Sequence, residues 1–211
     1  MQITVFGATG KVGSRVVAEA QDRGHDVIAV ARDPFSRNEL PEGIDLHRGD
    51  VSSVEDVVSL TEGRDAVVNA TRSTSSTDAV HNTRALLKGV ALTGTRLLTV
   101  GGAASLVVPG TSGQTVLDDA RYLSPSARHI GEVSLVQHRA HIEDQTVNWA
   151  YLSPPANLFP GSRTGSYRLG TNELLVDAEG RSQISMEDLA VVLLDEAEHP
   201  RHHRTQFTAA Y

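Results

Sequence analysis

The chain has no cysteine. Without a thiol it can form no disulfide, offer no thiolate nucleophile and build no zinc or iron–sulfur site on cysteine ligands. It also has no apolar run near the ~18 residues that a membrane helix requires, and Met1 leads straight into a strand-like pattern instead of a signal peptide. We therefore expect a cytoplasmic protein with no membrane partner.

The chain has fewer basic than acidic residues. Lys and Arg total 19 against 26 Asp and Glu, which gives a formal net charge of −7, and no long basic run is present. A partner with a phosphate backbone, such as DNA or RNA, is therefore not expected. The chain has 211 residues, of which 39% are hydrophobic, and this is enough for one sizeable core. We predict a single domain over 1–211 that acts on a small molecule, as a monomer or homodimer.

Short apolar runs alternate regularly with helical stretches, which is typical of βαβ units around a parallel sheet. The predicted strands are 2–6, 26–31, 44–47, 65–70, 96–100 and 147–151, and the predicted helices between them are 11–24, 52–60, 78–92 and 127–144. Helix 52–60 has Ser52 or Ser53 as its cap. This pattern predicts an α/β fold of the Rossmann type, a doubly wound parallel sheet in three layers.

Residues 152–211 are expected to complete the substrate side of this domain. Their pattern predicts a small hairpin (166–169 and 173–176), a helix over 189–198 with an N-terminal cap at 185–188, and a short edge strand over 205–209. A long Gly- and Ser-rich connection over 101–126 precedes them. Such connections are uncommon unless they serve as lids or binding loops.

A glycine-rich turn, Gly-Ala-Thr-Gly-Lys-Val-Gly over 7–13, follows the first predicted strand and opens the first predicted helix. In this context Gly7 allows the tight turn, Gly10 lets the backbone approach a pyrophosphate, and Gly13 lets the helix pack against the strand. Glycine-rich turns also occur wherever a strand doubles back into a helix. The position between strand and helix favours a dinucleotide site.

The end of the second strand decides which dinucleotide fits. An acidic residue there binds the ribose 2′-hydroxyl of NAD, whereas an arginine favours the 2′-phosphate of NADP. This chain offers Arg32, with Arg37 nearby, and the match of guanidinium to phosphate favours NADP(H). Asp33 follows at once and could be the ribose acid, so NAD(H) is possible.

Asp50 comes just after the third predicted strand. Two interpretations of this residue stay open. It is placed to meet the adenine ring together with Val51, and it is equally placed to cap the following helix.

These segments resemble the atypical short-chain dehydrogenase/reductase group, within it the NmrA-like NAD(P)H-binding proteins and relatives of biliverdin/flavin reductase described as NADH-flavin reductases. The resemblance covers nearly the whole chain. It rests on 7–13, 30–33 (Val-Ala-Arg-Asp), 49–51 (Gly-Asp-Val), 65–70, 100–102, 148–155 and 159–170. It implies that Gly7, Gly10 and Gly13 bind pyrophosphate, that Arg32 binds the 2′-phosphate and that Asp50 lies near adenine.

The main branch of that superfamily uses a Tyr-x-x-x-Lys pair, in which the lysine lowers the pKa of the tyrosine. The only lysines here are Lys11 and Lys88, and the residues four positions earlier are Gly7 and Arg84. The pair is therefore absent. Hydride transfer to a flavin, quinone or similar acceptor fits better, because such acceptors delocalise the incoming charge and can take a proton from water.

The nicotinamide is expected at the carboxyl ends of the fourth, fifth and sixth strands. Ser105 could orient the substrate or relay a proton, or simply bond to neighbouring backbone. Tyr122 or His129 could supply a proton, although a lid tyrosine and a helix-start histidine are the commoner explanations. The full set of predicted cofactor contacts is Gly7, Thr9, Gly10, Lys11, Val12, Gly13, Arg32, Arg37, Asp50, Val51, Asn69, Ala70, Thr71, Gly101, Gly102, Pro154 and Pro155.

No metal site is predicted, because His138 and His141 share a helix face without a third ligand at a recognisable spacing. Two functions remain. One is an NADPH-dependent reductase of a small redox acceptor. The other is a non-catalytic NADP(H)-binding sensor of the NmrA-like type, whose cofactor occupancy alters a protein partner.

Overall fold

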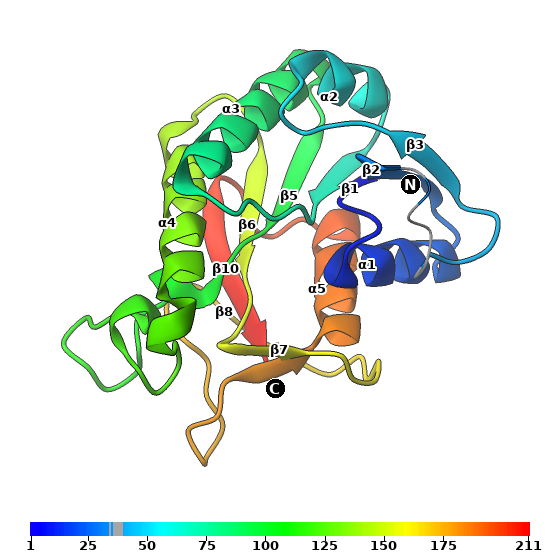
Figure 1. Cartoon of the computed structure of the whole chain (residues 1–211). Coiled ribbons are helices and arrows are strands. Elements are labelled where there is room, and N and C mark those ends of the chain that lie inside the picture. The colour runs from blue at the N-terminus through cyan, green and yellow to red at the C-terminus, as the bar shows by residue number, and fades with distance from the viewer. Residues whose placement is uncertain (34, 36–39) are drawn as a thin grey trace.

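A sheet of eight strands forms the centre of the molecule (Figure 1). The computed structural model describes residues 1–33, 35 and 40–211. The strands lie in the order β3-β2-β1-β4-β5-β6-β10-β8, and all are parallel except β8, which runs antiparallel to β10. Their bounds are β1 Gln2–Phe6, β2 Asp26–Ala31, β3 Asp45–Arg48, β4 Ala66–Asn69, β5 Arg96–Val100, β6 Trp149–Ser153, β8 Arg168–Gly170 and β10 Thr205–Ala210.

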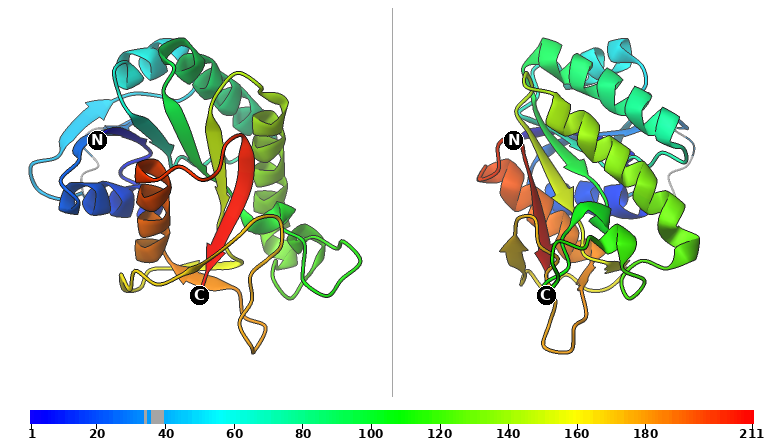
Figure 2. Two further views of the ribbon diagram at one scale, coloured as in Figure 1. Left: turned by 180° about the vertical axis from the view of Figure 1, so that it is seen from behind. Right: turned by 90° about the vertical axis from the view of Figure 1, so that its left-hand side faces the viewer.

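Helices cover both faces of this sheet, so the predicted three-layer Rossmann-type fold is confirmed (Figure 2). The helices α1 (Lys11–Asp22) and α5 (Met186–Glu198) pack together on one face. The other face carries α2 (Val54–Thr61), α3 (Ser76–Thr93) and α4 (Arg128–Glu143), with α3 packed between the other two. No helix in the described part of the chain is long and apolar enough to span a bilayer.

Local signals in the sequence set the helix ends. Ser53, Ser75 and Ser185 each accept a hydrogen bond from the backbone N–H three residues on, at the start of α2, α3 and α5. The alternative of Ser52 as the α2 cap is therefore wrong. At the other end, Gly94 takes a left-handed conformation (φ +70°) and stops α3.

Two separate apolar cores lie above and below the sheet. Val16, Val17 and Ala20 of α1 pack with α5 and with Val5 of the sheet in the first core. The second core, between the sheet and α2 and α3, contains Val57, Leu86, Val90, Trp149 and Tyr151 among others. The helical spacing of Val16, Val17 and Ala20 thus places all three on the buried face of α1.

The C-terminal part differs from the prediction in its pairing. The expected hairpin between 166–169 and 173–176 does not form, because β8 pairs with β10 and the backbone of 172–174 bonds to Val107 instead. The strand expected at an edge, β10, lies between β6 and β8. Two short strands that were not predicted, β7 (Asn157–Phe159) and β9 (Gln183–Ser185), form a small parallel sheet of their own.

The long connection over 101–127 contains three short 3-10 helices, η1 (Ala103–Ser105), η2 (Val116–Asp118) and η3 (Pro125–Ala127). Leu106, Val108 and Val116 pack with Leu174 into a small third core. This core and the bridge from Val107 to Glu173 hold the connection against the segment that follows β8.

Candidate functional site

The turn after β1 is held by three backbone hydrogen bonds. The N–H groups of Gly7 and Ala8 both donate to the Val30 carbonyl oxygen (3.0 and 3.1 Å), and the Gly10 N–H donates to the Gly7 oxygen (3.0 Å). The first hydrogen bond of α1 runs from the Ser14 N–H to Gly10 (2.9 Å). The N–H groups of Lys11, Val12 and Gly13 therefore precede the helical ladder and point out of the helix start, where an anion is favoured.

The three glycines of this turn have different surroundings. A Cβ at Gly7 would lie 2.8 Å from the Ala70 carbonyl, and one at Gly13 would lie 2.1 Å from the Gly7 oxygen. Gly7 also has φ +74°, a left-handed conformation that favours glycine. Gly10 is exposed, and its nearest neighbour would be 3.2 Å away. The protein's own packing thus requires Gly7 and Gly13, whereas the open side of Gly10 suits a close ligand.

Thr9 and Lys11 complete the outer side of the turn. Thr9 is half-buried and Lys11 is exposed, whereas Val12 packs against the α1 core. The Lys11 side chain is therefore a candidate to contact a bound phosphate, whereas Val12 can offer only its backbone N–H.

Arg32 lies directly after β2 and is exposed. It has no hydrogen-bond or ion-pair partner among the described residues. Asp33 uses Oδ1 to accept a hydrogen bond from the Phe35 N–H (3.0 Å), so part of this carboxylate is engaged in the local turn. Arg37 lies outside the described residues.

Asp50 forms a local turn of its own. Its Oδ1 accepts from the Ser52 N–H (2.9 Å), and its N–H donates to Asp56 Oδ2 (2.9 Å). Ser53 is the residue that caps α2, so the interpretation of Asp50 as that cap is wrong. Val51 is buried in the second core, which leaves its backbone as the only part that can face a ligand.

The strand register brings the ends of β1, β4, β5 and β6 level with one another. Phe6 pairs with Asn69, Asn69 with Thr99, and Thr99 with Tyr151. The strand order reverses between β1 and β4, which is the position where open α/β sheets bind ligands.

Asn69 and Thr71 close the end of β4 next to the glycine turn. Asn69 is buried, and its Oδ1 accepts from both the N–H (3.1 Å) and the hydroxyl (2.7 Å) of Thr71. Ala70 donates its N–H to the Phe6 oxygen (3.0 Å). This segment is therefore fixed against β1. Pro154 and Pro155, after β6, are buried.

Gly101 and Gly102 follow β5, and both are closely packed by side chains of the protein. A Cβ at Gly101 would lie 2.1 Å from ring atoms of Tyr151, and one at Gly102 would lie 2.7 Å from Ser134. The packing of Tyr151 and Ser134 therefore leaves no room for a side chain at either glycine, which the sequence alone did not indicate.

Tyr151 lies behind this glycine pair in a buried cluster of rings. His138 stacks on it at 4.6 Å between ring centroids, and the His141 ring meets its edge at 5.2 Å. The Tyr151 hydroxyl bonds to the Ser134 carbonyl and to Gln137 Oε1, both at 3.1 Å. Burial raises the pKa of Tyr151 well above its ordinary value, so this hydroxyl stays protonated.

Both histidines of the cluster are neutral at neutral pH. Burial lowers the pKa of His138 to about 4 and that of His141 to about 4. The ring nitrogens of His141 bond to the Thr99 hydroxyl (3.0 Å) and the Gln137 carbonyl (2.9 Å). No group of three or more His, Cys, Asp or Glu in the described part of the chain is arranged to hold a metal.

These histidines predict a pH dependence of stability. An unfolded histidine takes up a proton near pH 6.5, whereas folded His141 does so only near pH 4. The free energy of unfolding is therefore highest above pH 6.5 and decreases as the pH falls toward 4, by about 2 kcal/mol for His141 between pH 7 and pH 5. Urea unfolding at several pH values measures this slope. The His141→Gln variant is expected to have a shallower slope, and an equal slope in both proteins would contradict this assignment.

Ser105 and Tyr122 make hydrogen bonds to two different segments. The Ser105 hydroxyl donates to Gln206 Oε1 of β10 (2.7 Å), and the Tyr122 hydroxyl donates to the Gly180 carbonyl (3.1 Å). His129 bonds to the Thr74 carbonyl (3.0 Å). These contacts hold the three side chains to three different segments, and the catalytic roles suggested for them stay predictions.

The other tyrosine hydroxyls also have partners. Tyr167 donates to Asp195, and Tyr211 donates to Asp188 (2.6 Å). Lys11 lies at the start of α1 and Lys88 is exposed on α3. No hydrogen bond joins a tyrosine hydroxyl to a lysine in the part of the chain that the structure describes.

A cavity of 250 Å³ lies away from this edge, between α5 and the strands β8 and β10. Its lining includes Asp195, Glu196 and Glu198, and these carboxylates bond to Arg23, Arg96 and His25 among others. None of its lining residues belongs to the glycine turn or to the ends of β2, β4 or β5. This cavity is therefore separate from the predicted cofactor site.

Comparisons with known proteins agree with the geometry. The profile of the NAD(P)H-binding family matches residues 7–200. The uncharacterized protein YwnB of Bacillus subtilis (strain 168) is 36% identical over 220 residues, which cover 99% of this chain and 97% of YwnB. Two solved structures are similar over the whole chain. A Bacteroides thetaiotaomicron protein proposed to be an epimerase is 34% identical with a TM-score of 0.89 and 96% of its chain covered. A Streptococcus pneumoniae TIGR4 protein proposed to be an NADH-flavin reductase is 26% identical with a TM-score of 0.85 and 99% covered.

Proposed function

This chain belongs to the NAD(P)H-binding family of atypical short-chain dehydrogenases/reductases, and on that premise we propose that it is an NADPH-dependent reductase. Its fold is an NAD(P)H-binding oxidoreductase fold. The proposed reaction moves a hydride, with its two electrons, from NADPH to a flavin, quinone or similar small acceptor. The acceptor takes one further proton from water, and NADP⁺ is released.

The observation that carries this choice of acceptor is the engagement of all four tyrosine hydroxyls with partners other than lysine. Reduction of an isolated carbonyl by the superfamily's usual route needs a tyrosine whose pKa a lysine lowers. Burial instead raises the pKa of Tyr151, the tyrosine nearest the end of β5. An acceptor that delocalises negative charge needs mainly a well-positioned nicotinamide.

The preference for NADPH is supported by Arg32, an exposed guanidinium without a partner in the described part of the chain, directly after β2. The local bond from the Phe35 N–H to Asp33 also favours arginine over aspartate as the group that meets the ribose. When bound, the cofactor supplies the hydride. The turn over 7–13 would hold its pyrophosphate, and Asp50 would lie beside its adenine.

The nicotinamide half would lie against the ends of β4, β5 and β6. The residues proposed for this half are Asn69, Ala70, Thr71, Gly101, Gly102, Pro154 and Pro155. Ser105 and Tyr122 belong to the connection over 101–127, which would cover the acceptor. Their hydroxyl oxygens keep lone pairs that can accept a hydrogen bond from it.

The test is an anaerobic assay of the purified protein with saturating NADPH and a panel of riboflavin, FMN, FAD and a soluble quinone. We expect the absorbance of the reduced nicotinamide to fall with at least one acceptor, with one flavin or quinone reduced for each NADPH consumed. Protein boiled before the assay corrects for direct reaction in solution. NADPH binding without turnover on any acceptor would overturn the reductase and leave the sensor function.

A further inference from the structure

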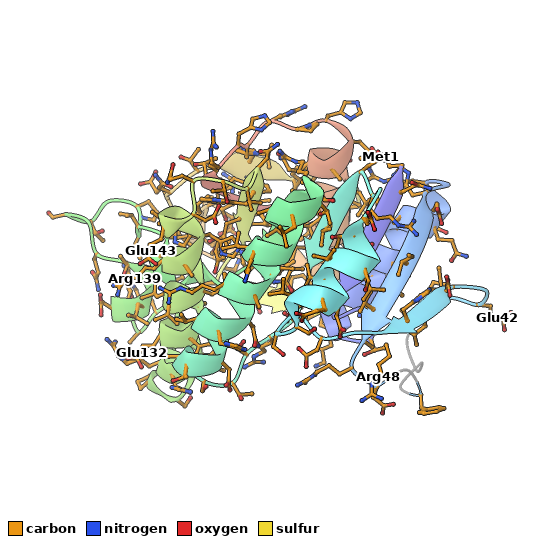
Figure 3. All side chains as sticks on the ribbon, turned by 90° about the horizontal axis from the view of Figure 1, so that it is seen from above. Met1, Glu42, Arg48, Glu132, Arg139 and Glu143 are labelled. Atoms are coloured by element: carbon orange, nitrogen blue, oxygen red, sulfur yellow. The ribbon has the colours of Figure 1, made fainter. Side chains whose placement is uncertain are left out.

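Arg48 is the last residue of β3, and it extends from the end of that strand (Figure 3). It is exposed, and no carboxylate among the described residues bonds to it. Some exposed arginines elsewhere in the described part of the chain do have such partners, and others do not. Arg121 binds Asp119 and Arg181 binds Asp177 (2.7 Å). Arg48 therefore belongs to the exposed arginines that have no carboxylate partner in the described part of the chain.

The strand pairing places Arg48 next to Arg32. Arg48 is the register partner of Ala31, the residue just before Arg32, and the Gly49 N–H donates to the Ala31 oxygen (3.1 Å). Neighbouring strands lie about 4.8 Å apart. Two long cationic side chains thus start from adjacent points at the carboxyl ends of β2 and β3.

The carboxylates around these strand ends are engaged elsewhere. Asp33 accepts from the Phe35 N–H, Asp50 accepts from the Ser52 N–H, and Asp56 accepts from the Asp50 N–H. The positive charges of Arg32 and Arg48, at the adjacent ends of β2 and β3, repel each other. A dianionic group between them would remove that repulsion.

We propose that Arg48 is a second guanidinium for the 2′-phosphate of NADPH and acts together with Arg32. This inference rests on the proposed function. With the pyrophosphate at the helix start beyond β1, the adenosine half runs toward β2 and then β3, in the strand order of the sheet. A phosphate monoester has three terminal oxygens and nearly two negative charges, so it can accept hydrogen bonds from two guanidinium forks.

The test compares the dissociation constants of NADPH and NADH for Arg48→Ala and the unaltered protein by calorimetric titration. We expect the NADPH constant to rise roughly tenfold and the NADH constant to change by less than about twofold. Adenosine 2′,5′-bisphosphate should lose affinity as NADPH does, whereas ADP should not. Arg48→Lys keeps the charge without the fork and should fall between the two proteins.

Arg139 provides a matched control. It is exposed on α4, far from β3, and is labelled in Figure 3. Arg139→Ala removes the same charge, so it should leave both constants unchanged. Equal thermal unfolding of the unaltered protein and the three variants excludes a folding effect.

Two outcomes would overturn the role of Arg48. One is an unchanged NADPH constant in Arg48→Ala, and the other is an equal loss for NADPH and NADH. If Arg32→Ala weakens the binding of NADPH selectively while Arg48→Ala does not, NADPH remains the proposed cofactor and the role of Arg48 as a second guanidinium is wrong. If the selectivity for NADPH is absent from the unaltered protein, the proposed cofactor preference itself fails.

Discussion

Gly13→Ala is expected to lower the free energy of unfolding by about 3 kcal/mol or more, because the new methyl group would lie 2.1 Å from the Gly7 carbonyl oxygen. The clashing atom belongs to the backbone of the turn, so no side-chain rotation can relieve the contact. Either α1 moves away from β1 or the turn opens, and both changes disturb the N–H groups at the helix start. Urea unfolding measures the loss, and titration with NADPH measures the loss of binding.

Gly10→Ala is the matched control, since it adds the same methyl group to the same turn. Its nearest neighbour would be 3.2 Å away, at the Gly7 oxygen, on an exposed side of the turn. This variant should fold with nearly normal stability and bind NADPH more weakly, because the methyl group would occupy the space that a pyrophosphate needs. Equal stability of Gly13→Ala and the unaltered protein would show that the turn is looser in solution.

Arg32→Ala is expected to raise the dissociation constant of NADPH about 10- to 100-fold and to leave that of NADH nearly unchanged. Only NADPH carries the 2′-phosphate that the guanidinium would bind. Arg32 is exposed and has no partner among the described residues, so its removal should not alter the fold. Titration of both cofactors against the same protein preparation makes the comparison direct.

Asp33→Ala separates the two interpretations of the end of β2. If Arg32 selects the cofactor, removing the neighbouring carboxylate should leave NADPH binding intact or strengthen it. An equal loss of NADPH and NADH affinity in Arg32→Ala, with a loss of NADH affinity in Asp33→Ala, would assign the ribose to Asp33 and the preference to NADH.

Most of the fold could be predicted because its signals are local. The valine spacing of α1, the serine caps of α2 and α5 and the apolar runs of β1 to β6 each lie within a few residues of the feature they predict. The pairing of β8 could not be predicted in this way. Its partner residues, Thr208–Ala210, lie about forty positions along the chain, and several three-residue strands compete for the same edges. The hairpin prediction chose the nearest partner and was wrong.

For the candidate site as well, features set by local sequence could be predicted and contacts between distant segments could not. The glycine turn, Arg32 and Asp50 come just after predicted strands and could be proposed from that position alone. The contacts of Gly101 with Tyr151 and of Ser105 with Gln206 join segments that are distant in sequence. No pattern within either segment predicts these contacts. Arg48, which we propose as a second guanidinium, was not among the predicted site residues, although it follows the predicted third strand directly. The signal was available, because the strand order of a doubly wound sheet places the third strand beside the second.

Calorimetric titration of the unaltered protein with NADPH and with NADH is the most direct test of the proposed cofactor site. We expect one cofactor bound per chain and a dissociation constant for NADPH at least about tenfold lower than that for NADH. Binding of neither cofactor would contradict the dinucleotide site at the turn over 7–13, and tighter binding of NADH would contradict the role of Arg32.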